Sequence, residues 1–313
     1  MTNALKAVRS GASALAARMD RHAVFWLQLP FVALFVVFII VPILVAFGLS
    51  FTDFNSIESP HWVGAENYIN ILTNDDVFSG YALPNTIKYA VIVGVFGYIL
   101  SFVLAWMLAQ LPRVPRTIMA AILYLPSMTG PTMIQNVWQV IFSGDKVGYL
   151  NAFLLKMDII REPIIWLSDS KYIMAIMIVV SLWSCMGIGF LSMLAGILNV
   201  NRELYEAAHI DGVSNRLQEF IYVTIPATKP HMMFGAIMSV VNAFQNANIG
   251  VQLSGANPTP GNAGQLLITH ADEHAFVRYE MGYSAAISVI VLIIIWVISQ
   301  LAKKVFRDKE AAG

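Results

Sequence analysis

The stretch YSAAISVIVLIIIWVISQLAKK, residues 283–304, decides the fold class of this chain, because it carries no charged side chain before Lys303. A helix needs about 20 mostly apolar residues to cross a bilayer. Five more stretches meet that requirement, at residues 25–50, 87–111, 117–142, 172–198 and 230–249. They are too long and too continuously apolar for barrel strands. The sequence therefore predicts an all-α, polytopic membrane protein with six transmembrane helices.

The composition agrees with this class and excludes others. Of 313 residues, 58% are hydrophobic and 12% are charged, and the mean hydropathy is +0.67. Soluble domains carry roughly 25% charged residues. The formal net charge of zero argues against a nucleic-acid partner. Cys185 is the only cysteine, so an intrachain disulfide is excluded.

The positions of Lys and Arg predict the orientation, because basic residues are in excess on the cytoplasmic side of membrane proteins. With both termini in the cytoplasm, thirteen of the nineteen basic residues lie inside and six outside. We therefore expect a cytoplasmic N-terminal segment (1–24), a six-helix membrane domain (25–306) with an extracytoplasmic cap (51–85) and a cytoplasmic loop (199–229), and a cytoplasmic tail (307–313).

The cytoplasmic loop is unusually long and polar for so apolar a chain, which favours a docking role. Asn201 is suited to cap a first helix. Gly212 can adopt the left-handed conformation that ends it, and Ser214 can cap a second helix. Pro226 is expected to stop that second helix. The pattern therefore predicts a helix, a glycine break and another helix.

Residues 206–212, EAAHIDG, resemble the E-A-A-x-x-x-G loop in the membrane subunits of ATP-binding-cassette (ABC) importers. Val213 and Ile225 stand where alanine and leucine are usual. The resemblance implies the type I ABC importer permease fold, in which this loop docks on an ATPase subunit. It assigns ATPase coupling to Glu206, Ala207, Ala208, Asp211, Gly212 and Pro226. An ordinary amphipathic surface helix with a glycine cap is the alternative interpretation.

Three shorter segments resemble the carbohydrate branch of the same family. Residues 63–68, VGAENY, are similar to an external V-G-x-x-N-Y segment, and residues 282–286, GYSAA, to a G-Y-A-S-A entry to the last span. Residues 253–258, LSGANP, are similar to an L-T-x-G-G-P turn, although Ala256 and Asn257 replace glycines. Together the segments indicate an oligosaccharide permease similar to the larger membrane subunit of maltose-type transporters.

The interior of the predicted spans suits a neutral solute. None of the six stretches carries Lys, Arg, Asp or Glu near its middle, whereas ion-coupled carriers usually bury such groups. In the fifth stretch Ser239, Asn242 and Asn246 share one helix face. Such side chains either bond to neighbouring helices or line a wet cavity. Both interpretations stay open on the residues alone, and so does a packing role for Trp138 and Trp183.

The resemblance to the maltose-type subunit implies a substrate path through the third to fifth core spans. The corresponding positions are Ser127, Pro131, Ser181, Ser184, Cys185, Ser239, Ala243 and Asn246, with Asn242 added from the polar face. Asn246 is the first choice for sugar contact. A small buried thiol in the core is the alternative role for Cys185.

The sequence predicts neither a catalytic residue nor a metal ligand. It contains no G-x-x-x-x-G-K-[ST] loop, so ATP and magnesium are expected in partner ATPase subunits, and no cofactor is expected in this chain. The implied partners are a second homologous permease subunit, two ATPase subunits, an extracytoplasmic sugar-binding protein, the sugar and the lipid bilayer of the bacterial cytoplasmic membrane. A stand-alone facilitator or a membrane scaffold that binds another cytoplasmic protein is the alternative.

Overall fold

The computed structural model describes residues 27–129, 131–245 and 248–306, and the statements below concern that part of the chain. It holds an isolated bridge between Thr52 and Trp62 and no β-sheet, which confirms the all-α prediction. The principal helices are α2 (Val41–Leu49), α3 (Glu66–Thr73), α4 (Leu83–Ala90), α5 (Gly97–Ala109), α6 (Arg113–Met128), α7 (Pro131–Ile141), α8 (Tyr149–Lys156), α9 (Ile173–Trp183), α10 (Ile188–Leu198), α11 (Arg202–Ile210), α12 (Arg216–Glu219), α13 (Ile225–Gln245), α14 (Ile249–Ser254), α15 (Leu267–Phe276) and α16 (Met281–Phe306).

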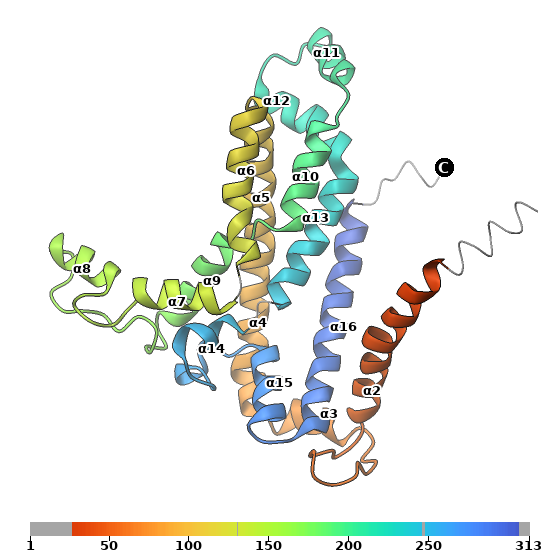
Figure 1. Ribbon diagram of the computed structural model, residues 1–313, viewed down its shortest axis with the longest axis vertical. Helices are drawn as coiled ribbons and strands as arrows, with labels where there is room; N and C mark the ends of the chain where they lie inside the picture. Colours follow the sequence, from red (N-terminus) through yellow and green to blue (C-terminus); the bar gives the residue numbers. More distant parts are fainter. Residues whose placement is uncertain (1–26, 130, 246–247, 307–313) are drawn as a thin grey trace, which may run out of the picture.

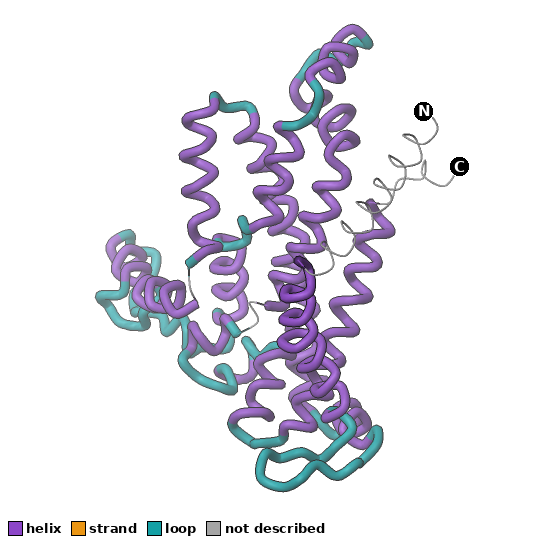
Figure 2. The backbone as a smooth tube through the Cα atoms, turned by 45° about the vertical axis from the view of Figure 1, so that its right-hand side comes forward, coloured by secondary structure: helices purple, strands orange, loops and turns teal. Residues whose placement is uncertain are grey.

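The helices form an elongated bundle with distinct ends. α5, α6, α10, α13 and α16 run along the long axis, while α7 and α8 project sideways (Figure 1). α11 and α12 stand at one end, and α3 and α15 lie at the other, as a second view also shows (Figure 2). α10 packs against α13 and α5, and α16 packs against α15 and α13. The long helices therefore connect one end formed by α11 and α12 with another end formed by α3 and α15.

Three described helices are long and apolar enough to cross a membrane: Leu27–Leu49, Phe78–Ala109 and Met281–Lys304. α9 and α10 together make a fourth span if their bent pair is counted as one. The second of these helices begins at Phe78, before the predicted start at residue 87. This helix therefore includes the last residues of the predicted cap (51–85). Residues 1–24 and 307–313 lie outside the described part.

Two predicted spans are not continuous helices. The stretch 117–142 is divided into α6 and α7 at Thr129, whose ψ of 129° is extended. Pro131 explains this break, because a proline lacks the N–H that a helix interior requires. The stretch 172–198 bends by 40° between α9 and α10. Gly187 lies at this bend with a non-helical ψ of −148°. The sequence pattern of apolar residues alone does not show either break.

The outside of the bundle is strongly apolar. Phe38, Leu44 and Trp296 have exposed fractions of 71%, 62% and 63%, and many other large apolar side chains are similarly exposed. Soluble monomers rarely carry such extensive apolar surface. Buried clusters meanwhile join α9 to α14, α13 to α16, and α5 to α10. This distribution fits a protein that packs its helices against each other and faces lipid outside.

Packing explains two of the segments that resemble the carbohydrate branch, residues 63–68 and 282–286. The buried Asn67 amide donates to the carbonyl oxygens of Ser50 and Thr52 at 2.9 and 2.8 Å, which joins α3 to the end of the first span. A Cβ at Gly282 would lie within about 2.0 Å of the Thr52 carbonyl oxygen. Glycine is therefore required where α16 begins against this turn.

Candidate functional site: the coupling loop and an internal cavity

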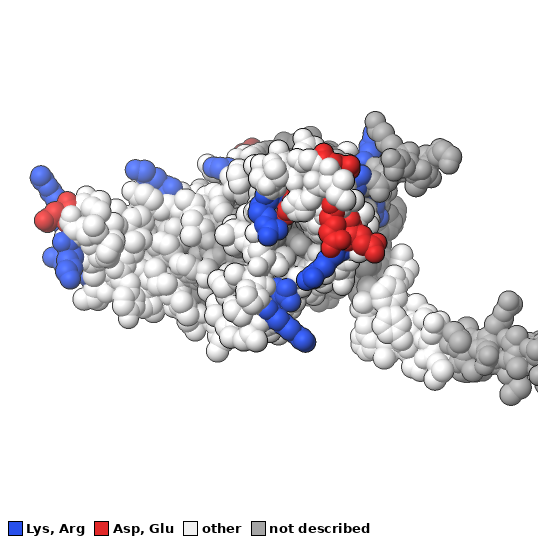
Figure 3. Space-filling view, turned by 90° about the horizontal axis from the view of Figure 1, so that it is seen from above, with Lys and Arg blue, Asp and Glu red and all other residues white. Residues whose placement is uncertain are grey.

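The coupling loop, defined here as residues 199–229, stands at the end of the bundle formed by α11 and α12 (Figure 1). Seen from this end, acidic and basic side chains gather over it, against mostly uncharged surface nearby (Figure 3). This placement puts the charged residues of the loop on a projecting surface.

Local capping chemistry gives the loop its shape. The Asn201 side chain accepts from the Glu203 amide at 3.2 Å, which confirms the predicted N-cap of α11. Gly212 follows α11 with φ of +95°, as expected for a left-handed glycine. The second N-cap prediction is wrong by one position. Asn215 caps α12 by accepting from the Gln218 amide at 2.8 Å, because the Ser214 hydroxyl instead donates to the Gln218 side chain.

Pro226 does not stop the second helix, contrary to the prediction. α12 continues through a π-helical turn, Phe220–Thr224, into α13, which begins at Ile225. A proline is tolerated in the first turn after such a change in hydrogen bonding, since its missing N–H leaves no bond broken there. Pro226 therefore lies at the joint between the coupling loop and a membrane helix, with its side chain exposed.

A buried carboxylate holds the two short helices together. The side chain of Glu219, 8% exposed, accepts from Arg216 at 2.9 Å and lies 3.0 Å from Nε2 of His209. Nδ1 of His209 lies 2.8 Å from the Val213 carbonyl oxygen. The Tyr205 and Thr224 hydroxyl groups are 2.9 Å apart. These contacts fix the bend without using the predicted coupling residues.

The predicted coupling residues are available for docking. Glu206, Ala207, Asp211 and Gly212 are exposed, and Ala208 is half-buried. Apolar side chains lie beside them, with exposed fractions of 87% at Ile210, 62% at Leu217 and 68% at Tyr222. An ordered, projecting surface that combines carboxylates with exposed apolar groups is typical of a protein interaction site.

The structure brings most of the predicted substrate-path residues into one place. Ser181, Ser184, Cys185, Ser239 and Asn242 line a single small cavity together with Ala243. Ser239 and Asn242 face this cavity from α13, in agreement with the predicted polar face. Ser127 is exposed and does not line it, although both Ser127 and Asn242 approach Gly187. Asn246 lies outside the described residues.

The cavity is nearly closed in this conformation. Its volume is about 20 Å³, which is room for about one water molecule. The Tyr89 hydroxyl lies 2.6 Å from that of Ser181, while the Ser184 hydroxyl donates to backbone oxygens one turn earlier. The Cys185 thiol lies 3.7 Å from the Gly97 carbonyl oxygen. A cavity of this volume is too small to hold a sugar.

Aromatic side chains lie near this region. The rings of Trp138 and Trp183 meet edge to face with centroids 5.4 Å apart, and Trp138 also stacks on Phe142 at 5.7 Å. Trp183 is 42% exposed. The tryptophans therefore have a packing role, and Trp183 still offers part of its ring to a solute.

Sequence analysis missed a polar cluster at the opposite end of the bundle. Asp75, His270 and His274 lie together there, with Glu280 and Tyr283 beside them. The available signal was the spacing of the two histidines, since residues four apart share a helix face. Asp75 is 195 positions from His270, so only the fold reveals the third member.

The fold and the loop together define a membrane permease subunit. Residues 97–309 match the family described as "Binding-protein-dependent transport system inner membrane component". The chain belongs to this family.

Relatives match over nearly the full length. The arabinooligosaccharides transport system permease protein AraP of Bacillus subtilis (strain 168) is 31% identical over 91% of this chain and 88% of its own length. The lactose transport system permease protein LacF of Rhizobium radiobacter is 28% identical over 90% and 93%. The chain also superposes on a bacterial ABC transporter for import of the acidic polysaccharide alginate with a TM-score of 0.77, at 20% identity over 94% of this chain and 98% of that one. The fold is therefore that of an ABC importer permease.

Proposed function

We propose that this chain forms part of the translocation path of a bacterial ATP-driven oligosaccharide importer and receives force through the coupling loop. The observation that carries the proposal is the projecting, internally braced loop with Glu206 and Ile210 exposed. Closure of the ATPase subunits would move this loop, and the uninterrupted path from α12 into α13 would carry the movement to the cavity.

The proposed cargo is a neutral sugar. The relatives are named for arabinooligosaccharides and lactose. The residues that line the cavity carry hydroxyl, amide and thiol groups and no Lys, Arg, Asp or Glu. Hydroxyl-rich solutes need such uncharged donors and acceptors. On the resemblance, Asn246 remains the first choice for sugar contact, with Ser239 and Asn242 on the same helix.

The proposed assembly contains a second homologous permease subunit, two ATPase subunits that bind ATP and magnesium, and an extracytoplasmic sugar-binding protein. A related alginate transporter has been solved in complex with a periplasmic protein that carries an alginate pentasaccharide. The excess of Lys and Arg on the side of the coupling loop supports a cytoplasmic position for that loop and for both termini. In this proposal the present chain makes and breaks no covalent bond.

Reconstitution in proteoliposomes tests the proposal. The chain is assembled with its second permease subunit and ATPase, and uptake of labelled arabinooligosaccharides is measured with the binding protein outside. We expect uptake to require ATP and Glu206→Lys to abolish it. Glu162→Lys is the matched control, because it makes the same charge change at an exposed site away from the coupling loop. Uptake that is equal with and without ATP would instead support the stand-alone facilitator.

A further inference from the structure

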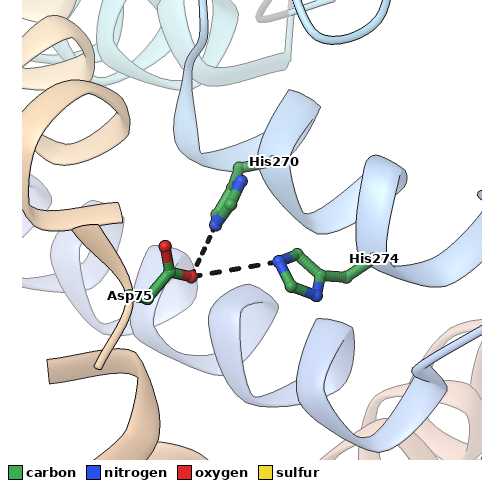
Figure 4. A group of neighbouring side chains, drawn as sticks. All are labelled: Asp75, His270 and His274. Atoms are coloured by element: carbon green, nitrogen blue, oxygen red, sulfur yellow. Dashed lines mark hydrogen bonds and ion pairs between the residues drawn. The ribbon is translucent and has the colours of Figure 1, made fainter. Parts of the chain in front are cut away.

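A compact group of metal-ligating side chains lies at the end of the bundle opposite the coupling loop. Asp75 precedes the helix that begins at Phe78, and His270 and His274 project from successive turns of α15 (Figure 4). Nε2 of His270 is 2.7 Å from Oδ2 of Asp75, and Nε2 of His274 is 3.9 Å from the same oxygen. One ligand atom from each residue lies within 4.8 Å of the others.

The histidines are buried and incompletely bonded. Their exposed fractions are 1% for His270 and 4% for His274. Nδ1 of His270 and Nε2 of His274 have no hydrogen-bond partner among the residues that the structure describes. An unsatisfied buried polar atom lowers the stability of the folded protein. The unpartnered Nε2 of His274 is directed toward Asp75, where a bound cation would satisfy it (Figure 4).

Neighbouring groups hold the possible ligands in position. Nδ1 of His274 lies 2.6 Å from a Glu280 carboxylate oxygen, so Nδ1 carries the proton and Nε2 keeps its lone pair. The Tyr283 hydroxyl and the Phe78 amide both donate to Asp75 at 2.8 Å. Carboxylate–histidine pairs of this kind orient the ligands of protein-bound metals.

The surroundings of Asp75 and His274 shift the pKa values of both side chains. Burial acts to raise the pKa of Asp75, but the hydrogen bonds from His270, the Phe78 amide and Tyr283 outweigh burial and leave this pKa below its usual value. Burial lowers the pKa of His274, against the Glu280 contact that acts to raise it.

Metal binding would change both contacts to Asp75. Two ligand atoms that share a tetrahedral zinc ion at about 2.1 Å each lie about 3.4 Å apart. The His270 contact would lengthen from 2.7 Å toward this value, and the His274 contact would shorten from 3.9 Å. His270 would give up its Nε2 proton and could carry one on Nδ1, which lies 3.9 Å from Glu273.

We propose that Asp75, His270 and His274 form a binding site for a divalent transition metal of the zinc type. Imidazole nitrogen favours such ions over calcium or magnesium. The three residues also line a polar cavity of about 590 Å³, together with Asn70, Asp76 and Arg278 among others. The metal would fasten the segment after α3 to α15. This proposal does not depend on the sugar or on the coupling mechanism.

Metal binding to the full-length chain, purified in detergent and stripped with a chelator, tests the proposal. Zinc is titrated against a chromogenic zinc indicator. We expect one equivalent per chain, with affinity reduced at least tenfold in His270→Gln and in His274→Gln. His61→Gln is the matched control, because His61 is an exposed histidine 3.4 Å from Asp53 in the same outer region. Equal loss in His61→Gln would overturn the assignment, and so would a wild-type chain that binds no zinc.

Cobalt(II) spectra provide a second measurement that needs no variant. The wild-type chain should develop the visible absorption bands of a tetrahedral cobalt site with nitrogen ligands, and one equivalent of zinc should remove them. A spectrum identical to that of cobalt in buffer would refute the site even if both histidine variants failed to fold.

Discussion

Each of the two ends of the bundle contains a buried glutamate paired with an arginine. At the coupling loop, buried Glu219 pairs with Arg216 and lies 3.0 Å from His209. At the opposite end, buried Glu273 pairs with Arg278 and lies 3.9 Å from His270. Each glutamate joins an arginine that remains partly exposed.

The surroundings of the two pairs differ. Beside Glu219, the carboxylate of Glu206 and the apolar Ile210 are turned outward. Beside Glu273, the polar groups of Asp75, His270 and His274 are turned toward each other. A buried ion pair therefore does not identify the function of a region by itself. The neighbouring side chains are more informative. Side chains turned outward suit docking of a partner, and side chains turned toward each other suit binding of a ligand.

The largest expected effect is that of a substitution at Gly212, and Gly255 is a second glycine with a positive φ for comparison. Gly212 and Gly255 have φ of +95° and +71°, and a Cβ at either would meet no other atom within 4 Å. An L-residue costs about 1–2 kcal/mol in such a conformation. We expect Gly212→Arg to reduce ATP-dependent uptake to background and to release the ATPase, with membrane insertion unchanged.

Gly255→Arg is the control, because it introduces comparable backbone strain away from the coupling loop. It should retain the ATPase in co-purification. If the two variants lost the ATPase equally, strain rather than docking would explain the effect, and the functional contrast between the ends would fail.

Substitution of Glu273 and of Glu219 should lower the free energy of unfolding by different amounts. Glu273 accepts two bonds from Arg278, at 3.2 and 2.6 Å, and a third from Gln265 at 3.2 Å. We expect Glu273→Gln to lower the free energy of unfolding by about 2 kcal/mol, since hydrogen bonds to charged groups contribute about 1.5–3 kcal/mol. Glu219→Gln should cost about 1 kcal/mol or less, because Arg216 is 74% exposed and solvent screens the pair.

Amide hydrogen exchange with a chelator present measures both effects. Exchange should accelerate throughout α15 and α16 in Glu273→Gln, but only within residues 202–224 in Glu219→Gln. A global effect of Glu219→Gln would show that the coupling loop is part of the cooperative core.

The sequence predicts the coupling loop better than it predicts the polar cluster of Asp75, His270 and His274. Asn201 and Gly212 act locally, through capping and a positive φ, so their roles follow from neighbouring residues. The prediction that Pro226 ends a helix is wrong, because the effect of a proline on a helix depends on the hydrogen bonding of the preceding turn. The π-helical turn Phe220–Thr224 leaves no local signal by which it could have been predicted.

Long-range contacts account for the rest. Family resemblance predicts Ser181 in the substrate path and helical spacing adds Asn242, and both residues line one cavity. The break at Gly187 and the meeting of Asp75 with His270 depend on how distant helices pack. Apolar periodicity carries no information about such pairings, so the predicted spans were more regular than the helices observed.

The cavity lies between the two ends, and its lining should affect transport more than assembly. Asn242→Leu and Ser239→Leu replace polar groups with larger apolar ones beside a space of about 20 Å³. We expect each to reduce sugar uptake about tenfold, equivalent to about 1.4 kcal/mol. Ser288→Leu, on an exposed position of α16, should leave uptake unchanged. Unchanged uptake in both cavity variants would assign these residues to helix packing.

The smallest expected effect concerns the hydroxyl pair at the cavity wall. Tyr89 is 1% exposed and its hydroxyl lies 2.6 Å from that of Ser181, so Tyr89→Phe removes one neutral buried hydrogen bond while keeping the ring. The free energy of unfolding should fall by about 1 kcal/mol. Tyr149→Phe, at a position 70% exposed, should not change the free energy of unfolding. Denaturation in detergent checks both variants.

Uptake assays separate two roles for the hydroxyl pair of Tyr89 and Ser181. Normal uptake in Tyr89→Phe fits a static contact between helices. A loss as large as that in Asn242→Leu would instead mean that the hydroxyl pair takes part in moving sugar, and that the force received at the coupling loop acts on this wall.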